Sequence, residues 1–336
     1  MKKKIYIITN ESFYFKDGNY FCDNIDLKSI PEELSKHGEI CILGRKSNIP
    51  RAKRINVNEI KVYSNIITYL FSILMNCILN KGNYLIISIT PYTFFASIIL
   101  KIFFKKHFIY LRSDGYEEYK AILGIIGKFI YHLMFSVATL QSHLISCRKH
   151  ILKNKSGQIV HPSQLNDKWF LPSKEINLKR IKLLYVGRIR VEKGIYSFLE
   201  LIRNTDIQLT IITSEKENKL NKISTNISVI NFENYNDSII KFYDDHNIFI
   251  LPSYTEAHPQ VLDEALARKR PVIIFKEIAH VVRDRKGVFI SNRDLKSLKI
   301  TIEHIINNHD SIKMEMIQNK LPTKKNFILE LANIVF

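Results

Sequence analysis

Cysteine is scarce in this chain of 336 residues, and its spacing gives no sign of a metal site. Only Cys22, Cys41, Cys77 and Cys147 occur, without a CxxC pair, and no two histidines stand at metal-ligand spacing. We therefore expect free and mostly packed thiols in a reducing compartment, with no structural zinc.

Long hydrophobic runs free of charge are also missing. The apolar run after MKKK has five residues before Asn10, which is too short for the core of a secretory signal. The apolar stretches 65–80 and 93–104 fall short of the roughly 20 residues that a membrane span needs. The stretch 121–140 carries Lys128 and His132 near its middle. Buried or interfacial helices are the better prediction for all three stretches.

Acidic residues are outnumbered, with 32 Asp and Glu against 50 Lys and Arg and a net charge of +18. Such a surplus attracts phosphates, nucleic acids and acidic lipids. No DNA-binding or RNA-binding module is visible, so we expect no nucleic-acid partner. Basic clusters at 2–4, 51–54 and 105–106 share the first half of the chain with the apolar stretches, which favours an anionic membrane surface as a partner. Solvated basic faces around buried helices would give the same composition.

Short β-branched runs alternate with helix-length segments along the whole chain, as in βα units around a parallel sheet. We predict strands at 5–9, 39–43, 84–88, 107–111, 143–146, 181–186, 207–213, 227–231, 247–251, 271–275 and 287–290. The segment 160–179 holds Pro162, Pro172 and the only Trp, and it has no clear period. These patterns predict an α/β protein with two doubly wound domains at 1–162 and 181–322 and a linker at 163–180. The apolar C-terminal helix at 323–336 should pack back on the first domain.

The strongest local motif is LLYVGRIRVEKGIYSFLELI at 183–202, in which a strand ends at Gly187 and a helix begins after Gly194. Ligands of open α/β sheets bind beyond the carboxyl ends of the strands. There the motif presents Arg188, Arg190 and Lys193 beside a helix N-terminus, which suits a diphosphate. A solvated charged loop with a glycine turn would have the same sequence pattern.

A second strand, loop and helix follow at 249–273. Glu256 lies in the loop, and Pro259 can open the helix at its first position. Glu264 falls on the flank of the buried stripe of that helix, where a carboxylate could reach ligand hydroxyls. An ordinary exposed helix glutamate is the alternative interpretation.

The GRxRxEKG turn, followed about 60 residues later by LPSxxE and a second Glu eight positions on, resembles the C-terminal domain of glycosyltransferase family 4. These are retaining enzymes with the GT-B fold, and the resemblance is to the bacterial surface-polysaccharide type. It covers 181–310 well and the first 160 residues only through their βα order. It implies two Rossmann-like domains facing each other across a cleft. It also implies a nucleotide-sugar donor and a glycan or lipid-linked acceptor, with neither a metal nor a cofactor.

The resemblance assigns roles to residues of this chain. Arg188 and Lys193 would hold the diphosphate, Glu256 would contact the donor sugar, and Glu264 would contact the ribose. Arg188, Lys193 and Glu256 are the expected catalytic residues. The full expected donor-binding set is Gly187, Arg188, Lys193, Ser253, Glu256, Ala257, His258, Pro259, Gln260, Val261 and Glu264.

The chain departs from the family pattern in its second half. The usual EGFG loop is replaced by Glu256 followed by Ala257, His258 and Pro259. Lys269 stands at the glycine of AxGxPV, and His280 stands at the glutamate of IPEVV. These changes affect the expected donor more than the expected reaction.

The first half departs from the pattern as well. The glycine-rich loop after the first strand is replaced by 10–24, in which only Gly18 could play a comparable part. Arg112 and Asp114 follow the fourth strand and could touch an acceptor or donor sugar, although an Asp114–Gly115 turn explains them equally well.

Together these patterns predict a retaining glycosyltransferase of cell-surface polysaccharide synthesis, located in the cytoplasm with peripheral attachment to the inner face of the membrane. Two alternatives stay open. A nucleotide-sugar epimerase can share the architecture, and a degenerate family member could bind a partner without catalysis.

Overall fold

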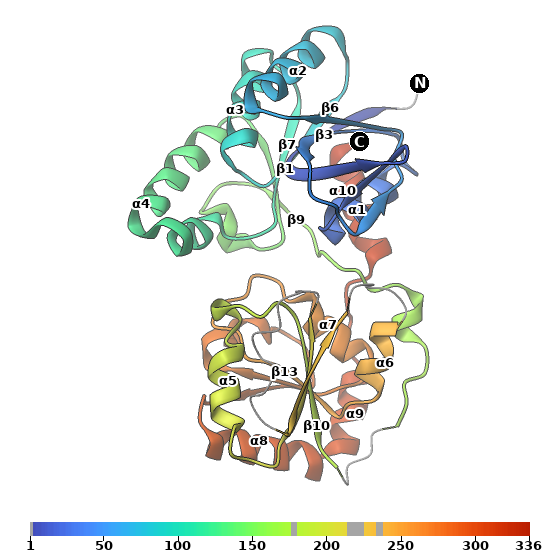
Figure 1. Ribbon diagram of the computed structural model, residues 1–336, viewed down its shortest axis with the longest axis vertical. Helices are drawn as coiled ribbons and strands as arrows, with labels where there is room; N and C mark the ends of the chain where they lie inside the picture. Colours follow the sequence, from blue (N-terminus) through green and yellow to red (C-terminus); the bar gives the residue numbers. More distant parts are fainter. Residues whose placement is uncertain (1–2, 176–179, 214–224, 233–237) are drawn as a thin grey trace. The chain divides into compact units, whose positions relative to one another are not determined.

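The computed structural model describes residues 3–175, 180–213, 225–232 and 238–336 (Figure 1). The chain divides into two compact units, one formed by Met1–His161 with Lys325–Phe336 and the other by Pro162–Lys324. Each unit has its own largely parallel sheet, which confirms the predicted α/β class.

The described part of the first unit contains a nine-stranded sheet. Its parallel strands lie in the order β5-β3-β1-β6-β7-β8-β9, while β2 and β4 add an antiparallel extension beside β1. The strands are β1 (Lys4–Lys16), β2 (Asn19–Cys22), β3 (Glu39–Ser47), β4 (Lys53–Ile55), β5 (Glu59–Tyr63), β6 (Asn83–Ile87), β7 (His107–Leu111), β8 (His143–Ser146) and β9 (Gln158–Ile159).

The segment expected to stand in for the family's glycine-rich loop is mostly strand. β1 continues through it to Lys16 and turns at Asp17 and Gly18 into β2, with Lys16 paired to Asn19. Asp17 and Gly18 have φ angles of 49° and 73°, as a two-residue hairpin turn of the primed type requires. Gly18 is therefore a hairpin residue, and it allows the turn because glycine adopts positive φ without strain.

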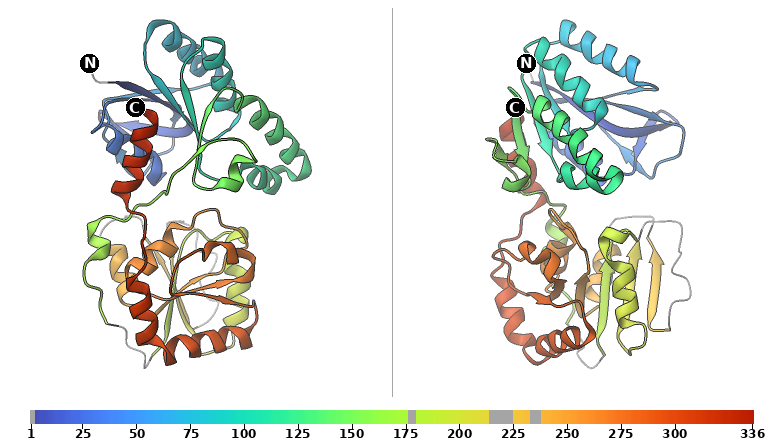
Figure 2. Two further views of the ribbon diagram at one scale, coloured as in Figure 1. Left: turned by 180° about the vertical axis from the view of Figure 1, so that it is seen from behind. Right: turned by 90° about the vertical axis from the view of Figure 1, so that its left-hand side faces the viewer.

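Helices cover both faces of this sheet. Ile5 and Ile7 of β1 pack in one core cluster with α1 (Ile25–Leu34) and α10 (Lys324–Val335). On the opposite face the hydroxyl of Tyr84 donates to the carbonyl of Asn76 in α2 (Ile66–Leu79) at 3.2 Å. This face also carries α3 (Pro91–Ile102) and α4 (Gly115–Ala138), and α3 packs against both α2 and α4 (Figure 2).

The C-terminal helix α10 is held on the first unit by apolar and polar contacts. Phe327 and Leu331 are buried in the core of that unit. The Glu330 carboxylate accepts a 2.8 Å hydrogen bond from the backbone of His161 and lies 3.1 Å from its ring Nδ1.

The second unit has a six-stranded parallel sheet within its described residues, in the doubly wound order β12-β11-β10-β13-β14-β15. Its strands are β10 (Lys182–Val186), β11 (Gln208–Thr213), β12 (Ile227–Asn231), β13 (Ile248–Leu251), β14 (Val272–Phe275) and β15 (Val288–Ser291). Its helices are α5 (Ile195–Ile202), α6 (Ser238–Asp244), α7 (Gln260–Ala267), α8 (Leu295–Asn307) and α9 (His309–Ile317). All of the predicted strands occur, while β2, β4, β5 and β9 were not predicted.

The described part of the expected linker at 163–180 is packed against the second unit. Leu165 and Trp169 are buried in the core of that unit, and the Trp169 ring meets the Tyr243 ring edge-on at 5.4 Å. Residues 176–179 of this segment lie outside the described residues.

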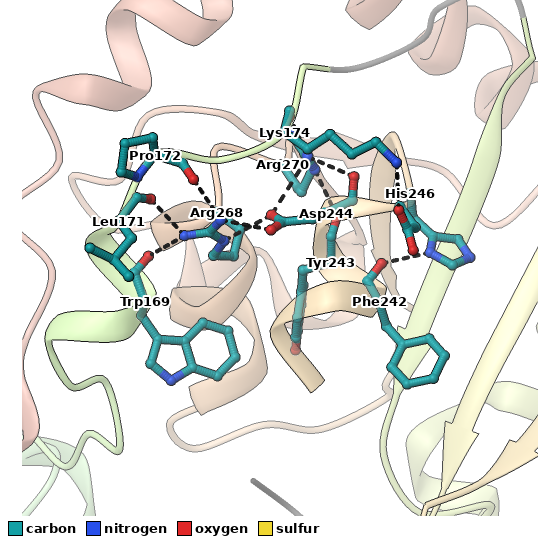
Figure 3. Close-up of polar contacts among 11 residues, drawn as sticks. Trp169, Leu171, Pro172, Lys174, Phe242, Tyr243, Asp244, His246, Arg268 and Arg270 are labelled. Carbon is teal, nitrogen blue, oxygen red and sulfur yellow. Dashed lines mark hydrogen bonds and ion pairs between the residues drawn. The ribbon is translucent and has the colours of Figure 1, made fainter. Parts of the chain in front are cut away.

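Two buried arginines of the ARKRPV segment hold this stretch in place (Figure 3). Arg268 forms a bidentate pair with Asp244, at 2.7 and 2.9 Å, and donates to the carbonyls of Trp169, Leu171 and Pro172. Arg270 donates to the carbonyls of Tyr243, Asp244 and Lys174 at 2.7 to 2.9 Å. The arginines therefore join the supposed linker to the fold.

Candidate functional site

The two predicted motifs lie on neighbouring loops of the second unit. β10 and β13 are adjacent and parallel, so the loops 187–194 and 252–259 leave the same edge of the sheet. The backbone N–H of Tyr254 donates to the carbonyl of Glu192 at 3.0 Å. Gly194 has φ +64°, and a Cβ there would lie 1.9 Å from the carbonyl oxygen of Pro252. Only glycine allows the two loops to approach this closely.

An ion pair joins the two loops through side chains. Lys193 Nζ lies 2.7 Å from Glu256 Oε1, and both side chains are largely buried. The Ser253 hydroxyl donates to the same carboxylate oxygen at 2.7 Å. Glu256 is therefore held by two donors, and the charge of Lys193 is fixed at the carboxyl edge of the sheet.

Arg188 lies on the first loop with its side chain exposed. Its backbone carbonyl accepts a 2.7 Å hydrogen bond from the Tyr185 hydroxyl, which closes the turn after β10. A Cβ on Gly187 would come within 2.8 Å of that hydroxyl, so the turn favours glycine. No ion pair between the Arg188 guanidinium and another described residue is present, and this cation can therefore meet an anionic ligand.

Arg293, which follows β15, contacts and supports the second of these loops. Its guanidinium lies 4.2 Å from the ring centre of Tyr254 and 4.3 Å from that of Phe275. It also donates to the carbonyl of Pro252 at 2.9 Å and to the hydroxyl of Ser197 at 3.2 Å. The loop that carries Glu256 is thus rigidly supported.

Glu264 lies deeper than the sequence analysis placed it. Its carboxyl group is buried, and the Tyr243 hydroxyl donates to Oε2 at 2.7 Å. Burial raises the pKa of Glu264 to about 7, although the hydrogen bond from Tyr243 opposes the shift. The alternative of an ordinary exposed helix glutamate is wrong, because Asp263 and Glu264 are both buried along with the apolar residues of α7.

His258 is turned into the protein. Its Nε2 lies 2.7 Å from the carbonyl of Pro162, so this nitrogen carries the donated proton. Burial lowers the pKa of His258 to about 4, and Nδ1 is buried without a hydrogen-bond partner. The side chain therefore supports the chain entering this unit. Pro259 was predicted at the first helical position of this helix. It is the N-cap of α7 instead, and the helix begins at Gln260.

The remaining predicted donor-binding residues frame the start of α7. Ala257, Gln260 and Val261 are half-buried, and Ser253 is fully buried. At two family departures the structure gives a local reason. His280 Nε2 donates to the carbonyl of Glu256 at 2.9 Å, and Lys269 has φ +57°, the conformation in which a glycine would be unstrained.

The residues predicted in the first unit have structural partners. Asp114 is the N-cap of α4, accepting from the backbone of Tyr116 at 3.0 Å, and it pairs with Lys153 at 2.6 Å. Arg112 lies 3.4 Å from Asp26. The structure therefore gives Asp114 a helix-capping position in place of the alternative Asp114–Gly115 turn.

Metal-binding clusters are absent from the residues that the structure describes, where no three His, Cys, Asp or Glu side chains gather. The four cysteines are buried, and none of them forms a disulfide. Burial raises the pKa of Cys22 and of Cys41 to about 12, so these thiols are poor nucleophiles.

Sequence reasoning missed Tyr243, Arg293 and the Arg268–Asp244 pair. Tyr243 and Arg293 lie on other strand–helix units, and their contacts arise only from the tertiary fold. Arg268 and Arg270 could have been recognised from the sequence as residues with buried polar partners, because two arginines just before a buried strand need such partners.

Comparisons with known proteins find glycosyltransferases. Residues 167–321 match the family model "Glycosyl transferases group 1". A capsular polysaccharide biosynthesis glycosyltransferase, CapM of Staphylococcus aureus, is 29% identical over 163 residues. That match covers 42% of this chain and 43% of CapM, so the chain spans less than half the length of the curated relative it matches.

Solved structures resemble the whole chain. A sucrose-phosphate synthase from Thermosynechococcus elongatus has a TM-score of 0.68 at 15% identity, covering 100% of this chain and 95% of that one. WaaG, a glycosyltransferase involved in lipopolysaccharide biosynthesis, has a TM-score of 0.67 at 14% identity, covering 98% and 99%. HepE of Anabaena, solved with UDP and glucose, has a TM-score of 0.68 at 10% identity, covering 99% of both chains. The chain thus has the two-unit α/β fold of the GT-B glycosyltransferases, and its residues 167–321 match the glycosyl transferases group 1 model.

Proposed function

We propose that the protein is a retaining glycosyltransferase that moves a sugar from a nucleotide-sugar donor to a glycan or lipid-linked acceptor in cell-surface polysaccharide synthesis. The observation that carries the proposal is the 2.7 Å ion pair between Lys193 and Glu256, which joins the two predicted motifs at one sheet edge. The group 1 domain match and the names of CapM and WaaG support the reaction class, and HepE, solved with UDP-glucose, supports the donor class.

The proposed chemistry depends on the departing diphosphate. The bond from the anomeric carbon to the diphosphate oxygen breaks, and a bond from that carbon to an acceptor oxygen forms. The proton of the acceptor hydroxyl passes to the departing diphosphate. Negative charge grows on the diphosphate, where the exposed Arg188 and the anchored Lys193 would neutralise it. No metal or cofactor forms part of the proposal, since the two cations would supply this charge.

Two carboxyl groups are assigned to the rest of the donor. Glu256 is held by Lys193 and Ser253 and would position the sugar. Tyr243 engages Oε2 of Glu264, and the proposal assigns Oε1 to a ribose hydroxyl. A carboxyl group fixed by a second side chain keeps its hydrogen-bonding geometry when the ligand arrives.

We propose that the protein is located in the cytoplasm, at the inner face of the membrane. A lipid-linked acceptor would be presented there, and the basic surplus of the chain favours an anionic leaflet.

A donor panel tests the proposal. Purified protein is mixed with UDP, GDP and ADP sugars, and the shift in thermal unfolding identifies a bound donor, because binding to the native state raises its apparent stability. Incubation with the bound donor and a polysaccharide-precursor acceptor should then give a glycosylated product with retained anomeric configuration, measured by mass spectrometry and NMR. Conversion of the donor to an epimer without any acceptor would replace the proposal with the epimerase reading. Failure of every nucleotide sugar to bind would leave a non-catalytic binding protein.

A further inference from the structure

Helix α4 of the first unit is a helical hairpin and not one continuous rod. Gly124 has φ 63° and ψ −148°, which interrupts the helix and divides it into arms 115–123 and 125–138. The ring centres of Tyr119 and Tyr131 lie 5.2 Å apart. A Cβ on Gly127 would come 2.1 Å from the carbonyl oxygen of Tyr119, so the two arms approach each other too closely for any residue but glycine at this position.

The tip of this hairpin exposes large aliphatic side chains. Ile122, Leu123, Ile125 and Ile126 are between 53% and 82% exposed, and they surround Gly124 on both sides. Apolar surface gathered in this way is uncommon on a soluble face and indicates an interaction site. Lys120 and Lys128 are exposed and flank the tip.

The apolar surface continues over the neighbouring helices. α4, α3 and α2 follow one another on the same face of the sheet, with α3 packed against both of the others (Figure 2). Ile67 and Phe71 of α2 and Phe95 and Ile102 of α3 are all exposed, and Phe104 just after α3 is 92% exposed. We call this surface, from the tip of α4 across α2 and α3, the apolar face.

The part of the chain that carries the apolar face is strongly basic. Residues 60–160, which hold these three helices, contain twelve Lys and Arg against three Asp and Glu. Apolar side chains flanked by lysines are typical of segments that lie at a bilayer interface, where the apolar part enters the acyl boundary and the ammonium groups meet phosphates.

Helix α4 is long and apolar enough to cross a membrane by length and composition. Its geometry favours a different placement, because the break at Gly124 folds the two arms together. Tyr131, Phe135 and Ala138 form a buried stripe that holds the second arm on the unit. The tip is therefore presented outward from a folded unit.

We propose that the apolar face docks on an anionic lipid bilayer, with the α4 tip inserted at the acyl boundary and Lys120 and Lys128 at the phosphate level. This surface would hold the protein at the membrane where the proposed function places it, so the inference rests on that function. It is tested separately, because docking is measured without a donor or an acceptor.

Vesicle flotation with the full chain tests the docking. Wild-type protein should float with vesicles of phosphatidylcholine and phosphatidylglycerol and bind less to phosphatidylcholine alone. Binding should weaken in 1 M salt, where the Debye length falls from about 10 Å to about 3 Å. The triple variant I122S/I125S/I126S should lower the partition coefficient at least about tenfold. The variant K120Q/K128Q should lose much of the preference for the anionic vesicles.

A matched control separates docking from general loss of apolar surface. The triple variant I300S/M314S/I317S replaces side chains of the second unit that are 55% to 65% exposed. It should float like the wild type, and both triple variants should keep the wild-type thermal unfolding. Wild-type protein that ignores anionic vesicles would overturn the proposal, as would a tip variant that floats like the control. A wild-type dimer that becomes a monomer in the tip variant, without vesicle binding, would also overturn it and make the face a contact between copies.

Discussion

The hydroxyl of Tyr243 donates a 2.7 Å hydrogen bond to Glu264, and the carbonyl of Tyr243 accepts one from Arg270 at the same distance. The carboxyl group that the proposal assigns to the ribose is therefore reached through a chain of buried contacts. It starts at the second arginine of the ARKRPV segment and ends at α7. An arginine at an unspecified position of the family's AxGxPV pattern thus supports a residue that the family pattern predicts.

Replacing Glu264 with Gln should change how stability depends on pH. The pKa of Glu264 is about 7 in the fold against an ordinary value of 4.5, so the native state keeps a proton that the unfolded chain has lost. The free energy of unfolding should therefore fall by about 3 kcal/mol as pH rises from about 4.5 to above 7. E264Q should lack this fall, because its amide does not titrate. Urea unfolding of both proteins between pH 4.5 and 8.5 measures the difference, and parallel curves would contradict the assigned burial.

Replacing Arg188 with Ala should abolish most turnover and leave the fold intact. The side chain is exposed, so its loss removes no packed contact. Loss of one preorganised cation at a developing anion typically costs about 100-fold or more in rate. We expect kcat/KM with the identified donor to fall by that factor at an unchanged Tm. R203A is the matched control, since Arg203 is an exposed arginine at the end of α5 and pairs only loosely with Glu200 at 3.6 Å. Equal activity of the two variants would remove Arg188 from the mechanism.

Much of the fold could be predicted from the sequence because parallel strands buried on both faces appear as short β-branched runs. The runs at 271–275 and 107–111 became β14 and β7 almost residue for residue. The strands β2 and β5 were missed because their half-exposed residues carry weak hydrophobic signals. The hairpin at Asp17–Gly18 had a clear turn signal that was interpreted only as a substitute for a loop.

The candidate site was predictable where chemistry follows strand ends in the sequence. Lys193 and Glu256 are 63 positions apart, yet both follow neighbouring strands, so topology brings them together. The direction of the His258 and Glu264 side chains was not predictable. It depends on Pro162 and Tyr243, which reach these positions only through the tertiary fold.

Replacing Arg268 with Met should destabilise the second unit strongly. The guanidinium is buried, pairs with Asp244 and satisfies three carbonyls of 169–172. Its removal leaves three carbonyls without a donor and leaves Asp244 with the more distant Arg270, at 3.8 Å, as its ion-pair partner. Breaking a buried pair in this way costs about 3–5 kcal/mol. K269G is the control, because glycine relieves the positive φ of Lys269 and adds chain entropy in the unfolded state, giving a net change within about 1 kcal/mol. Denaturant midpoints of the two variants should therefore separate clearly, and similar midpoints would show that the arginine is dispensable.

Replacing His258 with Asn should protect the protein against mild acid. Burial lowers the pKa of His258 to about 4 from an ordinary value of 6.5. Between these two pH values the ring is therefore protonated in the unfolded chain and neutral in the native state. Stability from this group is complete above pH 6.5 and is lost as pH falls toward 4, by about 3 kcal/mol in all. H258N should show that much less loss over this window, measured by urea unfolding at several pH values. An identical acid slope in the two proteins would mean that the ring is protonated in the fold.

Replacing Gly194 with Ala should separate the two loops of the site. A Cβ there would lie 1.9 Å from the carbonyl oxygen of Pro252, and the backbone has φ +64°. Strained backbone and overpacking together should cost roughly 2–4 kcal/mol, and the displaced loop should carry Glu256 away from Lys193. G18A is the matched control, since Gly18 has φ +73° with nothing within 4 Å, so only the backbone cost of about 1 kcal/mol applies. Donor binding should therefore fall in G194A and persist in G18A, because only the first substitution moves a loop to which the proposal assigns the diphosphate. Equal donor affinity in the two variants would show that the approach of these loops is not needed to form the site.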